Sequence, residues 1–99
     1  MTINETRNGD SMTVALEGRL DTLSSPELDT FLEKYYPKLD ELILDLEKLD
    51  YLSSSGLRVL LKAHNAMKSH GGTLLIRHAN QLVMGVFSVT GFDDILNIE

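Results

Sequence analysis

The sequence has 99 residues, which is the size of one domain. Its composition, with 42% hydrophobic and 24% charged residues, excludes disordered and fibrous proteins. It contains no cysteine, which excludes disulfides, zinc–thiolate sites, cysteine nucleophiles and iron–sulfur clusters. The net charge of −6 argues against nucleic acid and anionic membranes as partners, because an acidic surface repels phosphate groups.

The first two predicted elements form an antiparallel hairpin. Residues 3–7 alternate weakly between apolar and polar positions, and residues 12–20 alternate with Met12, Val14 and Leu16 on one face. The segment Asn8-Gly9-Asp10 separates them, and Asn-Gly tolerates the positive φ values of a tight hairpin turn.

A helix is predicted next, and it has more than one start signal. Ser25 can be the N-cap with Pro26 at the first helical position, or Ser24 and Glu27 can form a capping box. Pro37 marks the end of this helix. Its apolar stripe, at helical spacing, consists of Leu28, Phe31, Leu32 and Tyr35.

The second half of the chain alternates between strands and helices. Residues 41–46 are an apolar run that suits a strand of a parallel sheet, and residues 73–76 form another strand. A helix between them stops at Gly71-Gly72, and a third helix begins at Asn80 and ends at Gly91. The predicted apolar faces of these two helices are Leu57, Leu60, Leu61, His64 and Met67, and then Leu82, Val83, Val86 and Phe87.

The order of elements is therefore ββαβαβα, with residues 92–98 compatible with a turn and either a short strand or a helical turn. This order predicts an α/β fold in one small domain over residues 1–99. We expect a mixed sheet of about four to five strands, a leading hairpin followed by βαβαβα, with helices packed against it.

Two strand-to-helix junctions carry unusual polar side chains. Asp21 follows the second strand, and three consecutive serines, Ser53 to Ser55, follow the third. Binding sites in α/β folds gather at such junctions, and an anion on the first turn of a helix is stabilised by free N–H groups and the helix dipole. One serine suffices as a cap, so capping alone does not explain three. Gly56 is expected to leave room for a partner and to tolerate replacement by alanine.

Several segments together resemble STAS domains, specifically the small anti-sigma factor antagonists. They are residues 44–46 and 49–61 (LDL and LDYLSSSGLRVLL), residues 16–21 and 25–28, and residues 87–96 (FSVTGFDDIL). The resemblance implies a phosphorylation-switched module that binds a partner, both anti-sigma factor and serine kinase, when unphosphorylated. A PP2C-type phosphatase reverses the modification.

The resemblance also implies the site residues. Aligned on Gly56, the family's phosphoacceptor is Ser54, and Ser53 stands where the family carries an aspartate, which makes Ser53 a second candidate acceptor. Asp21 falls where the family carries an acidic residue near the partner surface, and we expect it close to Ser54 in space. The predicted partner-binding residues are Asp21, Asp50, Ser53, Ser54, Ser55 and Gly56.

The sequence leaves two other functions open. STAS domains also act as scaffolds of signalling assemblies and as accessory subunits of lipid transporters. A Ser–His–Asp hydrolase would use Ser54 as nucleophile. Against it, the Gly-x-Ser-x-Gly pattern is absent and a chain of this length leaves little room for a substrate pocket. Its base would be His64 or His78, and its orienting carboxylate Asp45 or Asp50.

No metal, cofactor or enzymatic activity is expected. His64 and His70 are six residues apart on a helix, and no carboxylate completes a standard zinc spacing with them or with His78. The phosphate-binding pattern GxxxxGK[ST] is missing, so nucleotide is expected to come from the partner kinase. The chain has no signal-peptide pattern and no apolar run near the roughly 20 residues that span a bilayer, so a cytoplasmic protein without direct membrane insertion is expected.

Overall fold

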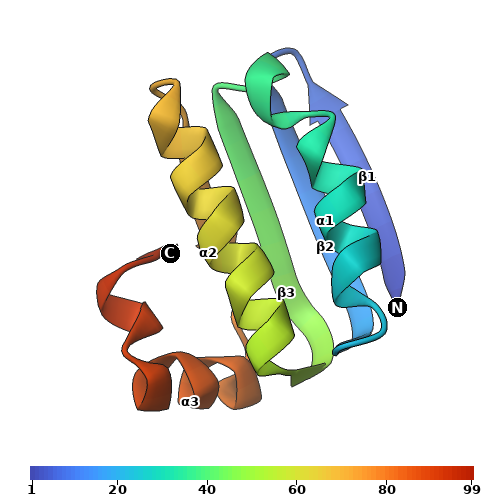
Figure 1. The fold of residues 1–99 in the computed structure, drawn as a ribbon, viewed down its shortest axis with the longest axis vertical. Helices are drawn as coiled ribbons and strands as arrows, with labels where there is room; N and C mark the ends of the chain where they lie inside the picture. Colours follow the sequence, from blue (N-terminus) through green and yellow to red (C-terminus); the bar gives the residue numbers. More distant parts are fainter.

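Five strands form one mixed sheet in the order β1-β2-β3-β4-β5, in a computed structural model that describes all 99 residues (Figure 1). The strands and helices are β1 Thr2–Asn8, β2 Ser11–Leu20, α1 Ser25–Glu33, β3 Glu41–Leu52, α2 Ser54–Ser69, β4 Thr73–Arg77, α3 Gln81–Thr90 and β5 Asn97–Ile98. Two 3-10 turns cover Tyr36–Lys38 and Phe92–Asp94. The predicted α/β class and element order are confirmed, and the tail contains both a helical turn and a short strand.

The leading hairpin is antiparallel, whereas all later strand pairs are parallel. Asn8 pairs with Ser11, so Gly9 and Asp10 are the two turn residues, and Asn8 is the last residue of β1. Gly9 has a φ of +63° and Asp10 does not have a positive φ, which is the pattern of a type II′ turn. Glycine is favoured at that first turn position because a side chain there is strained.

Helices α1 and α2 lie side by side over one face of the sheet, and α3 runs across their direction at one end (Figure 1). They enclose a single core in which Leu28 and Leu32 of α1 and Leu60 and Met67 of α2 are fully buried. Helix α3 adds Val83 and Phe87 to this core. The expectation that Leu82 faces the core is wrong, since its side chain is 48% exposed.

Strand β3 extends to Leu52, beyond the predicted segment 41–46. Two bulges interrupt the strand pattern of its second half, so the sequence did not predict that part. Its pairing with β2 slips by one residue after Asp45 and again after Leu49. Each slip inserts an extra residue into β3, so the buried positions Leu46, Leu49 and Leu52 stand three residues apart. A spacing of three fits neither the two-residue period of a strand nor a long helix.

The predicted helix stops at glycine are confirmed. After α2, Gly71 has a φ of +87° and donates to Lys68 O, while Gly72 donates to Met67 O at 2.8 Å. These two bonds form a Schellman motif, which satisfies carbonyls that the end of a helix leaves free. Helix α3 ends in the same left-handed conformation at Gly91, where φ is +80°.

Tyr36 carries an unsatisfied polar group in the core. Its side chain is 7% exposed and its hydroxyl has no hydrogen-bond partner. Burial, together with the negative charges of Asp29 and Glu33, raises the pKa of the Tyr36 phenol well above its ordinary value.

We expect Tyr36→Phe to raise the free energy of unfolding by about 1 kcal/mol, because it removes a buried hydroxyl that makes no hydrogen bond. The unfolded phenol loses its proton near pH 10. Since folding raises the pKa, the wild type should lose stability as pH rises above that value, and the variant should lose less. Urea denaturation at pH 7 and at pH 10.5 measures both effects. The control is Tyr35→Phe at the half-buried neighbour; an equal gain there would contradict the assignment.

Candidate functional site

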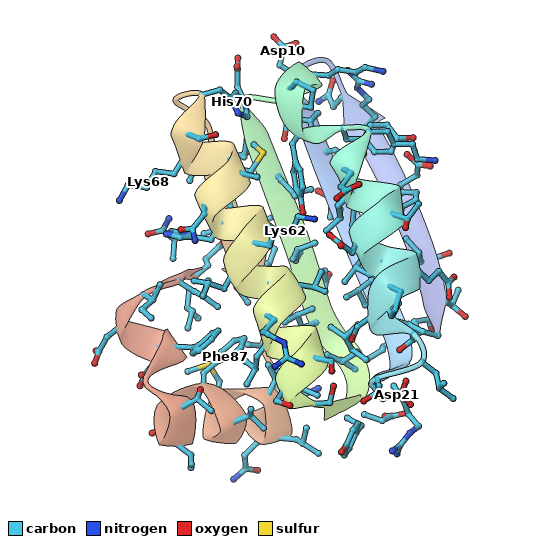
Figure 2. All side chains as sticks on the ribbon, viewed as in Figure 1. Asp10, Asp21, Lys62, Lys68, His70 and Phe87 are labelled. Carbon is cyan, nitrogen blue, oxygen red and sulfur yellow. The ribbon has the colours of Figure 1, made fainter.

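The two polar junctions meet at the carboxyl ends of β2 and β3. The Ser53 amide donates to Leu20 O at 2.9 Å, so the residue before Asp21 is joined directly to the start of α2. Figure 2 shows Asp21 at this end of the sheet, opposite the end that carries Asp10 and His70. The structure therefore brings Asp21 and the serine cluster to one edge.

The three serines have three different environments. Ser53 is the N-cap of α2, and its Oγ accepts a hydrogen bond from Gly56 N at 3.1 Å. Ser55 Oγ accepts from Arg58 Nη2 at 3.2 Å. Ser54, the first residue of α2, is exposed and its hydroxyl makes no hydrogen bond to the protein. Only one of the three hydroxyls is therefore both exposed and free.

Gly56 faces the core and not a partner, which corrects its predicted place in the binding surface. It is buried and helical, without a positive φ. A Cβ added there would lie 2.8 Å from Leu20 Cγ and 2.9 Å from Leu52 Cδ1. The expectation that alanine is tolerated is wrong, because Leu20 is fully buried and its branch carbon has little space to move.

We expect Gly56→Ala to lower the free energy of unfolding by about 1–3 kcal/mol through overpacking against Leu20 and Leu52. The matched control is Gly85→Ala in α3, where an added Cβ meets nothing within 4 Å. There alanine should raise stability by about 0.5–1 kcal/mol, because glycine is the poorer helix former. Chemical denaturation of the two variants gives the comparison, and a Gly56 variant at least as stable as the wild type would refute the close contact.

Asp21 organises the loop between β2 and α1. Its Oδ1 accepts from the backbone amides of Leu23 and Ser24, both at 3.0 Å. The backbone hydrogen bond from Ser24 lowers the pKa of the Asp21 carboxyl most, helped by the Ser24 hydroxyl, the Leu23 amide and the charge of Arg19. Asp21 is thus a structural cap as well as an acidic surface group.

Neither predicted start of α1 is correct in detail. Ser24 occupies the N-cap position, but its side chain makes no capping hydrogen bond to the helix, so the box with Glu27 does not form. Its hydroxyl instead contacts Arg19 O at 2.6 Å. Ser25 is the first helical residue, and its hydroxyl donates back to Asp21 O. The carboxylate of Asp21 binds the amides of Leu23 and Ser24, which precede the helix, so it orders the turn that leads into α1.

We expect Asp21→Ala to lower the melting temperature, and Asp21→Asn to lower it less, because the amide oxygen can still accept hydrogen bonds. The lowered pKa means that the charged carboxylate stabilises the fold above about pH 4, and that this contribution is lost as pH falls through the folded-state pKa. The difference in melting temperature between wild type and Asp21→Asn should therefore shrink between pH 6 and pH 3. A constant difference across that range would contradict the role of the charge.

Apolar and cationic side chains that were not predicted surround these residues. Leu23 is 90% exposed and Tyr51 is 40% exposed. The guanidinium of Arg19 lies 4.1 Å from the centre of the Tyr51 ring and also pairs with Asp21 at 3.6 Å. The sequence signal that could have indicated Leu23 and Tyr51 is a bulky apolar residue within an otherwise polar junction. Asp50 lies exposed at the second bulge of β3, without an ion pair.

The residues proposed for a hydrolase do not assemble into a catalytic triad. Ser54 makes no hydrogen bond to His64 or His78, and no cavity of the molecule is lined by Ser54. His64 is half-buried on the inner side of α2, as predicted, and its Nδ1 has no partner. His78 is hydrogen-bonded to Asp45 instead.

No helix of the structure has the length and apolar character needed to cross a membrane.

Comparison with known proteins identifies relatives over nearly the whole chain. The family described as Mlab, STAS domain, matches residues 3–97. The chain is 27% identical over 92 residues to the anti-sigma-B factor antagonist of Bacillus subtilis, covering 93% of this chain and 84% of that protein. It is 33% identical over 85 residues to BtrV of Bordetella bronchiseptica, a candidate anti-sigma factor antagonist by its description, covering 84% of this chain and 73% of that protein.

Solved structures share the fold at low sequence identity. A candidate anti-sigma factor antagonist from Thermotoga maritima superposes with a TM-score of 0.90 at 19% identity, covering 97% of this chain and 84% of that one. Unphosphorylated SpoIIAA, an anti-sigma factor antagonist, gives 0.86 at 16% identity over 99% of this chain and 88% of its own. The phosphorylated Bacillus form gives 0.80 at 15% identity, over 99% and 91% of the two chains.

Proposed function

The chain belongs to the STAS domain family, and we propose that it is an anti-sigma factor antagonist whose binding to its partner is switched by phosphorylation of Ser54. The observation that carries the proposal is the exposed Ser54 hydroxyl, free of hydrogen bonds, on the first turn of α2. The names of the relatives, and the solution of SpoIIAA in both phosphorylation states, support it.

The local geometry favours Ser54 over Ser53 as the phosphoacceptor. Ser53 is half-buried, and its oxygen holds the Gly56 amide, so a kinase would have to break the cap of α2 to reach it. Ser55 is half-buried and bound to Arg58. Ser54 can enter a kinase active site without loss of any hydrogen bond within the protein.

A phosphate on Ser54 leaves the fold intact. It adds about −1.5 to −2 charges at a helix start, where free amides and the helix dipole stabilise an anion. Arg58, four residues further along α2, shares a helix face with Ser54, and its guanidinium already reaches back to Ser55. The α2 first turn has no acidic residue to repel the phosphate.

The partner, in this proposal, detects the change at the surface. The unmodified edge combines Leu23 and Tyr51, which are apolar and exposed, with the small neutral hydroxyl of Ser54. An interface fitted to that hydroxyl must desolvate a dianion after phosphorylation, which costs several kcal/mol when the partner offers no cation to pair with it. Since each 1.4 kcal/mol is a factor of ten in affinity, binding falls by roughly 100-fold or more.

The remaining parts of the switch come from the partners. The chain acts as a cytoplasmic regulator and not as an enzyme; its partner is both anti-sigma factor and serine kinase, and supplies ATP. A PP2C-type phosphatase removes the phosphate. The alternative, an accessory subunit of a lipid-transport complex, is not favoured, because the relatives are named anti-sigma factor antagonists. Identification of the protein bound by the unmodified chain tests this choice.

We expect the purified partner kinase and ATP to place one phosphate on wild type and on Ser53→Ala, and none on Ser54→Ala, as measured by mass spectrometry. Ser54→Ala should bind the partner constitutively, and Ser54→Asp should fold normally but bind roughly 100-fold more weakly. Circular dichroism checks the fold of each variant. Phosphate that persists in Ser54→Ala and vanishes in Ser53→Ala would move the switch to Ser53.

A further inference from the structure

Three potential metal ligands converge at the first bulge of β3. Asp45 and Glu47 project from β3 at its first bulge, and His78 follows the end of β4. His78 Nδ1 lies 3.0 Å from Asp45 Oδ2 and 3.8 Å from Glu47 Oε2, and the three ligand atoms all lie within 4.8 Å of one another. We propose that these three side chains bind a divalent transition-metal ion of the Zn²⁺ class.

The spacing of the donor atoms suits a small ion. With metal–ligand bonds of about 2.0–2.1 Å, neighbouring donors of a tetrahedral zinc site lie about 3.3 Å apart. The two distances from His78 Nδ1, 3.0 and 3.8 Å, fall on either side of that value. One imidazole and two carboxylates suit zinc and similar transition metals, whereas Mg²⁺ and Ca²⁺ prefer oxygen ligands in larger number. A fourth position is left for water.

Contacts outside the three ligands hold them in place. Asp45 Oδ1 accepts from the Glu47 amide at 3.1 Å, which leaves Oδ2 directed toward His78. The side-chain amide of Asn80 lies 2.8–3.1 Å from the carbonyls of Leu46, Glu47 and Leu49, and so fixes the bulge. Metal sites depend on such outer contacts to orient the ligands.

The cations next to the cluster in the sequence form ion pairs with other carboxylates. Arg77, beside His78 in sequence, pairs with Glu99 at 2.9 Å. Lys48, beside Glu47, pairs with Glu17 at 3.8 Å. With a neutral imidazole, Asp45 and Glu47 therefore keep two negative charges, which one divalent ion neutralises. The two carboxylates also line an open cavity of about 250 Å³, whose walls include Lys48 and Glu17 but not His78.

The test is titration of the full, untagged, chelator-treated chain with ZnCl₂ at pH 7.5, by calorimetry and thermal denaturation. We expect one ion per chain with micromolar or tighter affinity. At a free Zn²⁺ concentration of 100 times Kd, the melting temperature should rise by roughly 10 °C or more. MgCl₂ at the same concentration should have no effect.

Two variants remove ligands with little disturbance of the backbone. His78 has a φ of +56°, which asparagine tolerates well, so His78→Asn removes the imidazole and keeps the turn. Asp45→Asn keeps an acceptor for the Glu47 amide. Each should weaken binding at least tenfold, while the control His70→Asn, at the C-terminal end of α2 and outside the cluster, should bind as the wild type does.

Three results would overturn the proposal: no heat and no thermal shift with Zn²⁺, equal affinity in wild type and His78→Asn, or loss of binding in His70→Asn. In the first case the cluster is a hydrogen-bonded ion pair only. None of these measurements involves Ser54 or the partner, so their outcome is independent of the proposed switch.

Discussion

The site depends on the close packing of Gly56 between the side chains of Leu20 and Leu52. No other residue type fits there without displacing side chains of the core, so the first turn of α2 can approach the ends of β2 and β3 directly. The hydrogen bond from Ser53 N to Leu20 O fixes the same approach from the backbone side. Ser53 and Gly56 are held against the sheet on either side of Ser54 and Ser55, and Ser54 is exposed at this edge.

Several local structural signals were predicted accurately from the sequence, although the start of α1 was not. The Asn80 cap, the stop at Gly71-Gly72 and the stop at Gly91 each depend on hydrogen bonds within about five residues, so a short motif is sufficient. The second half of β3 has no such motif. Its bulges arise from the register with β2, and only that pairing explains why buried leucines stand three residues apart.

The candidate site, like the fold, could be predicted only in part from the sequence. Serines before a helix indicate a cap, but the division of roles among Ser53, Ser54 and Ser55 depends on rotamers and on the position of Arg58. The spacing of histidines along the chain does not reveal the cluster of Asp45, Glu47 and His78 at the first bulge. The parallel register, which pairs Asp45 with Arg77, brings Asp45 and His78 together. Because the two residues are 33 positions apart, no short sequence motif indicates their contact.

Strand β1 is polar along almost its whole length, and this affects how copies of the chain meet one another. All but one of its residues are exposed, and they include Glu5 and Arg7. The opposite edge of the sheet is β5, which has only two residues. Charged or very short edge strands are poor templates for strand addition, so neither edge favours growth of the sheet into aggregates. Crowded chains of this protein should therefore resist cross-β association.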